Sequence, residues 1–256
     1  PGDPDLLDVL RIQGRLASRL GRPEVTERVV AQIEQMAEAN VSAVRRAESL
    51  ATARCRRADQ MRLTGPQRSA DGLFDEVLSD LNSEVRSTVR LTCLMGSASV
   101  KENLGQFEGA VQRYQDAIRL ADGAGLNGQR ASLRTSLANV LKRAGQVEQG
   151  FVVTAEARRI AEQYQDWMSL SEAATVHAIL LTDLGRTQEE LDTLQQAIDY
   201  ARRAGAPRDE GLGLANLADY YLQRGDYARA LALAREALPL SQAAHDPVGE
   251  KLAIVN

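Results

Sequence analysis

The sequence predicts an all-α fold, a right-handed α-solenoid of about six helical pairs with a 40-residue period and the first part of a seventh pair. Three observations predict it. Four glycines, Gly105, Gly145, Gly185 and Gly225, lie forty residues apart. An alanine lies seven residues before each glycine, and another lies twelve residues after it. The chain is also rich in Ala, Leu, Gln, Glu and Arg and poor in β-branched and aromatic runs, which favours helix throughout.

Each repeat is expected to consist of a helix, a tight turn at the glycine, a second helix and a looser loop. Glycine suits the left-handed end of a helix, where a side chain costs energy. The alanines suit points where two helices approach closely. Apolar residues recur three and four positions apart in 212–222 and 227–238, as they do in amphipathic helices. Because a single pair cannot bury such a stripe, neighbouring pairs are expected to stack.

The first ninety residues follow this pattern less closely. Gly14 takes the alanine position and Gly21 the turn position. Further helices are expected over 24–39, 41–63 and 69–81, with a break at Thr64-Gly65-Pro66. The predicted organisation is one continuous solenoid, with degenerate pairs in 1–90, four regular repeats in 91–244 and the first part of a truncated helix in 245–256.

Composition excludes several classes of function. The net charge of −4 is too balanced for a general nucleic-acid binder. Two histidines leave little for histidine-based catalysis, and no spacing of Cys and His suits a metal. Cys55 and Cys93 cannot make a disulfide framework. They could lie near each other on the first helices of neighbouring pairs, but we interpret them as two isolated buried thiols.

The ends of the chain predict a fragment of a longer protein. The sequence begins with Pro1 and stops within an apolar helical pattern at 252–256, although a naturally short last helix is the alternative. There is no basic-then-apolar signal peptide at the start. No apolar stretch approaches the roughly 20 residues that a transmembrane helix needs. Exposed Leu252, Ile254 and Val255 could pair end to end in a homodimer.

Four motifs that resemble chemical sites are better explained as structure. Residues 123–128 spell G-x-G-x-x-G, but a helix and no strand precedes them, so an inter-repeat loop is expected. His177 is expected to be a hydrogen-bonded core residue. The acidic pairs Asp75-Glu76 and Glu189-Glu190 are expected on solvated helix surfaces, since adjacent residues do not share a helical face. A basic stretch comprises Arg45, Arg46, Arg54, Arg56, Arg57 and Arg62. Because no aromatic residues that could stack on bases lie between these arginines, the arginines are expected to be solvated or paired within the chain.

Two segments resemble a tetratricopeptide repeat (TPR). One runs from Asn216 through Tyr221 to Gly225-Asp226-Tyr227 and Ala230, and the other covers 104–117. The resemblance is strong over 92–244 and looser where Val147, Thr154 and Thr187 replace the usual aromatic residues. The period of 40 exceeds the usual 34. The six extra residues are expected to lengthen the helices and the loop between repeats.

The resemblance implies that the first helix of each pair lines a concave groove. The implied groove residues are Thr92, Met95, Ser99, Glu102, Asn103, Ser132, Thr135, Asn139, Lys142, Arg143, Glu172, Thr175, Ile179, Thr182, Asp183, Leu212, Ala215, Asp219, Leu222 and Gln223. Those chosen as partner-binding are Ser99, Glu102, Asn103, Asn139, Lys142, Arg143, Asp183, Asp219 and Gln223. Asn139, Lys142 and Arg143 suit the carboxylate clamp of chaperone-binding TPR domains, but the acids in the neighbouring repeats oppose it. A peptide or a partner helix is the preferred ligand, and a flanking segment of the protein itself is the alternative.

The repeat style is also similar to the TPR sensor regions of bacterial GGDEF diguanylate cyclases. That likeness implies a non-catalytic sensory module, periplasmic, that regulates an output domain outside the sequence. No catalytic residue, cofactor, metal or nucleic-acid partner is predicted, and the full-length protein could carry the cyclase. Similar repeats occur in cytoplasmic nucleotide-switch transcription regulators, and a stand-alone scaffold or adaptor is a further alternative.

Overall fold

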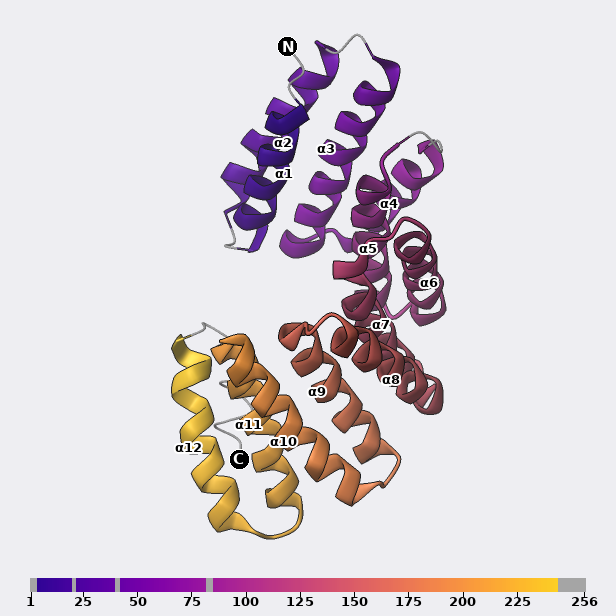
Figure 1. Cartoon of the computed structure of the whole chain (residues 1–256). Helices are drawn as coiled ribbons and strands as arrows, with labels where there is room; N and C mark the ends of the chain where they lie inside the picture. Colours follow the sequence, from indigo (N-terminus) through magenta and orange to yellow (C-terminus); the bar gives the residue numbers. More distant parts are fainter. Residues whose placement is uncertain (1–3, 20–21, 40–41, 82–84, 244–256) are drawn as a thin grey trace. The chain divides into compact units, whose positions relative to one another are not determined.

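The computed structural model describes residues 4–19, 22–39, 42–81 and 85–243, and those ranges contain helices and no strand (Figure 1). Consecutive helices pair, which confirms the all-α repeat fold that the sequence predicts. The predicted helices 24–39, 41–63 and 69–81 match α2, α3 and α4 to within two residues. The helices are α1 (Pro4–Arg19), α2 (Pro23–Glu38), α3 (Ala43–Thr64), α4 (Gln67–Asp80), α5 (Ser87–Asn103), α6 (Phe107–Gly123), α7 (Asn127–Arg143), α8 (Val147–Gln163), α9 (Trp167–Asp183), α10 (Thr187–Ala204), α11 (Pro207–Gln223) and α12 (Tyr227–Ala243).

The helices belong to two compact units, residues 1–126 and residues 127–256. In the first unit each helix from α1 to α5 packs on the next one, and α3 also packs on α1 and α5. In the second unit each helix from α7 to α11 packs on the next one, and α9 also packs on α7 and α11. Contact between successive first helices is therefore a feature of both units. The proposed dimer contact at Leu252, Ile254 and Val255 lies outside the described residues.

From α5 to α12 the turns between repeats are as tight as the turns within them, so the expected looser loop is wrong for these repeats, whereas α2 and α3 are joined by four residues and α4 and α5 by six. Gly105, Gly125, Gly145, Gly185, Gly205 and Gly225 all have φ between 62° and 77°, and they follow one another every 20 or 40 residues. At most of these turns a backbone N–H bonds a carbonyl five residues earlier, such as Gln106 N to Lys101 O at 2.8 Å and Leu126 N to Ala121 O at 2.9 Å. This is the Schellman closure of a helix. The period of 40 is made of two 17-residue helices and two three-residue turns, so helix length alone absorbs the extra residues.

Small residues set the distance between helices, as the sequence predicts. The eight repeat alanines are all 0–1% exposed: Ala98, Ala117, Ala138, Ala157, Ala178, Ala197, Ala218 and Ala237. Glycine permits still closer contact at two interfaces. A Cβ on Gly213 would lie 2.8 Å from Cγ1 of Ile198, and one on Gly96 would lie 2.3 Å from Cζ of Phe74. Larger residues at these positions would push the helices apart.

A disulfide joins Cys55 of α3 to Cys93 of α5, so the interpretation of two isolated thiols is wrong. The two Cα atoms are 5.5 Å apart and the residues are 38 positions apart in the chain. Both residues are buried, within a cluster that also contains Phe74, Val77 and Val100. The first helices of two neighbouring pairs approach closely enough here for a covalent link, and the sequence spacing alone does not reveal it.

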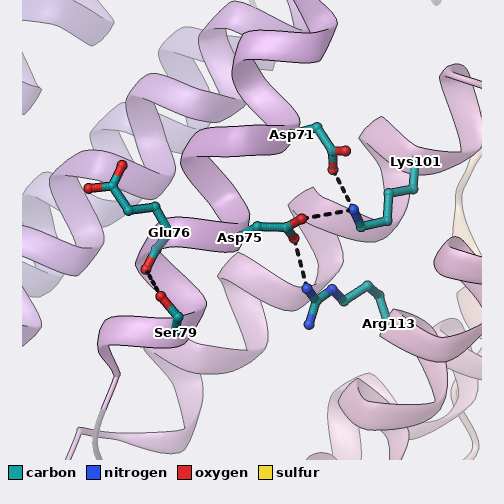
Figure 2. Close-up of polar contacts among 6 residues, drawn as sticks. All are labelled: Asp71, Asp75, Glu76, Ser79, Lys101 and Arg113. Atoms are coloured by element: carbon teal, nitrogen blue, oxygen red, sulfur yellow. Dashed lines mark hydrogen bonds and ion pairs between the residues drawn. The ribbon is translucent and has the colours of Figure 1, made fainter.

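Ion pairs between charged side chains also connect α4, α5 and α6 of the first unit (Figure 2). Lys101 Nζ lies 2.8 Å from Asp71 Oδ1 and 3.1 Å from Asp75 Oδ2, and Arg113 bonds the second oxygen of Asp75 at 2.7 Å. The cluster ties α4 to α5 and α6. Asp75 and Glu76 lie on the helix surface as expected, with side chains 44% and 61% exposed, and Asp75 is in addition an ion-pair partner within the chain. The Lys101 side chain is only 12% exposed, and the two carboxylates compensate for the loss of solvent around its ammonium group.

Candidate functional site

The predicted partner-binding residues of the second unit gather at the C-terminal ends of three successive first helices. Asn139, Lys142 and Arg143 lie in the last turns of α7, Asp183 is the last residue of α9, and Gln223 is the last residue of α11. Because α9 packs on both α7 and α11, the three helix ends belong to one packed layer. Every one of these side chains is at least partly exposed. The layer can therefore present polar groups from three repeats to one partner.

An ion pair connects the first two of these helix ends. Lys142 Nζ lies 3.5 Å from Asp183 Oδ2, with side-chain exposures of 33% and 37%. The cation stands where the dipole of α7 favours positive charge, whereas Asp183 stands at a helix end that disfavours an anion. Lys142 therefore offsets an unfavourable position of Asp183. A ligand carboxylate would have to compete with Asp183 for Lys142, which agrees with the weak case for a carboxylate clamp.

The third helix end has its own polar contact. Gln223 Nε2 donates to Asp219 Oδ2 at 2.6 Å, one helical turn away. Asp219 is half-buried and Gln223 is exposed. The remaining predicted residues, Ser99, Glu102 and Asn103, lie at the end of α5 in the first unit and form a separate set. The sign of charge thus changes between neighbouring first helices, from Lys142 and Arg143 on α7 to Asp183 and Asp219 on the next two.

Three residues that the resemblance placed in the groove are buried. Thr135 donates to Ala131 O at 3.2 Å and Thr175 donates to Ser171 O at 3.0 Å, each one turn earlier in its own helix. Ala215 is 0% exposed. These residues face neighbouring helices, so their assignment to the groove is wrong. The 3.6-residue period places them beside the exposed positions, and only the packing of the adjacent repeat shows which side of each helix is covered.

A buried carboxylate was missed by the sequence reasoning. Glu190 is 5% exposed, although the Glu189-Glu190 pair was expected on a solvated surface. Its oxygens accept from Thr182 Oγ1 at 2.8 Å and from Arg224 at 3.2 Å, and Arg224 also stacks 3.6 Å from the ring centroid of Tyr220. Glu190 therefore links α9, α10 and the end of α11. Thr182, expected in the groove, is directed towards this contact.

His177 is a hydrogen-bonded core residue, as the sequence predicts. It is 7% exposed, it stacks on Phe151 with ring centroids 4.4 Å apart, and its Nδ1 lies 2.6 Å from Thr154 Oγ1. Thr154 Oγ1 also lies 2.9 Å from Phe151 O, so the hydroxyl bridges the imidazole and the backbone of α8. Burial, with the positive charges of Arg158 and Arg186, lowers the pKa of His177 to about 4. The imidazole is neutral at physiological pH and holds α9 against α8.

The other motifs also have structural roles. Gly125 of the G-x-G-x-x-G sequence caps α6 before the turn to α7, as expected for an inter-repeat connection. Within the basic stretch, Arg54 pairs with Glu76 and Asp80, Arg57 with Glu34 and Arg62 with Asp59. Among the described residues, no group of three or more His, Cys, Asp or Glu side chains is arranged to hold a metal ion. In the same ranges, no helix combines the length and the apolar character needed to cross a bilayer.

Comparison with known proteins agrees with the repeat fold. The tetratricopeptide repeat family model matches residues 214–247. BtubC (BKLC) from P. vanneervenii is similar in structure, with a TM-score of 0.69 and 18% identity over 92% of each chain. No curated protein matches the chain in sequence.

Two further similar structures are longer than this chain. A STAND protein with a tetratricopeptide repeat sensor from Pyrococcus horikoshii has a TM-score of 0.70 and 14% identity, over 97% of this chain and 38% of that one. A Rap protein complexed with Competence and Sporulation Factor has a TM-score of 0.66 and 15% identity, over 98% of this chain and 69% of that one. The 40-residue pairs, the glycine-capped turns and these likenesses agree: the chain has a helical-repeat fold of the tetratricopeptide type, and residues 214–247 match a tetratricopeptide repeat.

Proposed function

We propose that the chain is a non-catalytic interaction module that binds a peptide or protein partner on the first helices of residues 127–223. The observation that carries this proposal is the layer of polar side chains at the ends of α7, α9 and α11. Lys142 and Asp183 are each about one-third exposed. Because each side chain is already partly exposed, a charged partner can exchange with this ion pair at a small desolvation cost, which gives selectivity by charge pattern.

The test uses a random peptide library displayed on phage and selected on the whole chain. Enriched peptides are titrated by fluorescence polarisation against the wild type, the double variant Asn139→Ala/Arg143→Ala and the control Arg159→Ala. Arg159 is exposed on α8, a second helix, so the control removes the same charge outside the proposed layer. We expect the double variant to bind at least about tenfold more weakly, and the control to bind normally. Equal binding by all three folded proteins, or no enrichment at all, contradicts the proposal.

Within this proposal the module regulates a diguanylate cyclase (GGDEF) output domain and lies in the periplasm. The repeat style of the sequence supports the output domain. The Cys55–Cys93 disulfide supports the compartment, because disulfides persist in the periplasm and are rare in the cytoplasm. Thiol labelling of the protein in intact cells tests the compartment, since a free thiol at either cysteine would contradict it. The gene sequence that follows residue 256 tests the output domain.

A cytoplasmic nucleotide-switch transcription regulator is the second candidate. The likeness to the STAND protein with a tetratricopeptide repeat sensor favours it. The structural similarity extends over nearly all of the present chain but only 38% of the STAND protein, so the repeats of that protein are one part of a longer chain. An upstream nucleotide-binding domain, together with reduced cysteines in the cell, would favour this candidate over the cyclase. Both candidates assign the same binding role to the helical repeats.

A further inference from the structure

Charge is distributed unequally over the first helices of residues 127–223. Helix α7 contains four arginine or lysine residues and no carboxylate. Helix α9 contains two carboxylates and neither Lys nor Arg, and α11 contains three carboxylates and one Arg. Because α9 packs on both α7 and α11, the layer of first helices is basic on the α7 side and acidic on the side of α9 and α11.

The polar residues at the helix ends repeat this order. Lys142 and Arg143 stand at the end of α7. Asp183 stands at the end of α9, and Asp219 lies one turn before the end of α11. The partner of Asp219 among the described residues is the neutral amide of Gln223, at 2.6 Å, so this contact does not cancel its charge. Both carboxylates lie where the dipole of their own helix disfavours an anion, so a cationic group from a partner would be favourable beside them.

An apolar side chain lies between the basic and the acidic side of this layer. Helices α7, α9 and α11 end at residues 143, 183 and 223, so positions forty apart lie at the same level. The 3.5 Å contact of Lys142 with Asp183 agrees with this register. Asn139, Ile179 and Asp219 thus form one row across the three helices, and Ile179 is half-buried. The row runs from the basic end of α7 over an apolar centre to a carboxylate.

We propose that the bound segment is an extended peptide with an acidic residue at one end, an apolar residue in the middle and a basic residue at the other end, an inference that rests on the interaction function proposed above. The acidic residue meets Arg143, which is exposed beside Lys142, so Lys142 can stay paired with Asp183. The apolar residue covers Ile179, and the basic residue meets Asp219. Neighbouring helix axes are roughly 10 Å apart, so the row spans roughly 20 Å. An extended chain rises about 3.3 Å per residue, which places the two charged residues about six positions apart.

The first test compares three fluorescein-labelled octapeptides with blocked termini, by fluorescence polarisation against the whole chain at low salt. The first peptide has two aspartates, a central pair of leucines and two arginines in that order, with alanine spacers. The second has the same residues with the opposite charges alternating, and the third has aspartates at both ends. We expect the first to bind at least about tenfold more tightly than either of the others. Equal binding of the first two peptides overturns the proposal.

The second test reverses the charge of Asp219. Asp219→Lys should weaken binding of the first peptide at least about tenfold and should make the peptide with aspartates at both ends the tighter ligand. Asp192→Lys is the matched control, because Asp192 also accepts from a glutamine amide one turn away but lies on the second helix α10. The control should keep the wild-type preference, and circular dichroism checks that each variant is folded. A wild-type preference in Asp219→Lys overturns the proposal.

Different outcomes overturn this proposal and the interaction function on which it rests. If peptides selected from the phage library bind through Asn139 and Arg143 while the three octapeptides bind alike, the interaction function stands and the charge order is overturned. If neither the library nor the octapeptides yield binding, both are overturned. A charge preference that appears only in longer peptides, with charged ends about thirteen positions apart, overturns the extended form and assigns a bound helix.

Discussion

The two units hold their neighbouring helical pairs together by different interactions. Residues 127–243 repeat one geometry, with 17- or 18-residue helices and turns closed by residues of positive φ. Residues 4–126 vary more, since their helices run from 14 residues in α4 to 22 in α3. The first unit also contains the disulfide and the Lys101 ion-pair cluster, which join helices of neighbouring pairs. Where the repeat is regular, small residues and turn geometry suffice; where it is irregular, stronger links hold neighbouring pairs together.

Removal of the disulfide should produce the largest difference in unfolding free energy between the two units. In the chain-entropy description, a bond that closes a 38-residue separation contributes about 4 kcal/mol to the free energy of unfolding. We expect Cys55→Ala/Cys93→Ala to lower the stability of the first unit by about 3–4 kcal/mol and to leave the second nearly unchanged. Urea unfolding measures this with two signals. The fluorescence of Trp167, the single tryptophan, reports the second unit, and far-ultraviolet circular dichroism reports all helices.

The expected result is an early transition in circular dichroism that the Trp167 signal does not share. Reduction of the wild type with dithiothreitol should reproduce it. One shared transition at the same urea concentration in variant and wild type would show that the disulfide is not what holds the first unit together.

Acid should weaken the second unit through His177. The neutral imidazole is buried, and its pKa falls from 6.5 to about 4 in the folded chain. The unfolded chain therefore takes up a proton before the folded chain does. The stabilisation is complete above pH 6.5 and is lost as the pH falls to about 4. The slope approaches about 1.4 kcal/mol per pH unit, so the total loss is at most about 3.4 kcal/mol.

The check is urea unfolding followed by Trp167 fluorescence across this pH range. His177→Gln should be less stable near neutral pH and should show a smaller loss of stability on acidification. Because the two proteins differ only at residue 177, the difference between the two profiles reports the contribution of His177. Identical pH profiles would show that the imidazole is not held neutral by its contact with Thr154 and Phe151.

Glycine substitutions test the close contacts of the first unit. Gly96→Ala would bring a Cβ to 2.3 Å from the ring of Phe74, which is 1% exposed and has little room to move. We expect a loss of about 1–3 kcal/mol from overpacking. Gly72→Ala is the matched control in α4, because its Cβ would meet nothing within 4 Å. That variant should gain about 0.5–1 kcal/mol from helix propensity, and thermal melts measure both changes.

Much of the fold follows from local sequence, because glycine and alanine carry the pattern. Only Gly accepts positive φ without strain, and only small residues permit close helix contact, so both leave periodic marks. The 20-residue spacing is harder to recognise in the sequence, because Gln165 interrupts the glycine series between Gly145 and Gly185. The equivalence of the two turn types is clear only from the backbone angles of the structure.

The candidate site depends on contacts between repeats, which local sequence does not specify. The pairing of Lys142 with Asp183 requires two residues 41 positions apart to end neighbouring helices at the same level. The burial of Thr135, Thr175 and Glu190 likewise depends on the adjacent repeat. The disulfide has the same origin, since its 38-residue separation becomes a 5.5 Å distance only when α3 lies against α5.

The turn at Gln165 in the second unit can be compared with the glycine turn at Gly125 in the first. It is the one non-glycine residue with positive φ among those described, at 51°, and its turn carries the same hydrogen bonds as the glycine turns. A side chain in this conformation costs roughly 1 kcal/mol. Gln165→Gly should therefore stabilise the second unit by about 0.5–1 kcal/mol, because greater freedom in the unfolded chain offsets part of the gain. Gly125→Gln, at φ 65° in the equivalent turn of the first unit, should lose a similar amount.

Thermal unfolding followed by Trp167 fluorescence measures the gain, which corresponds to a rise in Tm of roughly 2–6 °C for a unit of this size. Gln163→Gly is the control, since Gln163 is the exposed last residue of α8 and its helical conformation gives glycine no advantage. A rise for Gln165→Gly without a rise for Gln163→Gly would assign the gain to the left-handed turn. If neither variant rises, the strain at Gln165 is already relieved by the contacts of α8 and α9, and regular geometry contributes less to the second unit than helix packing does.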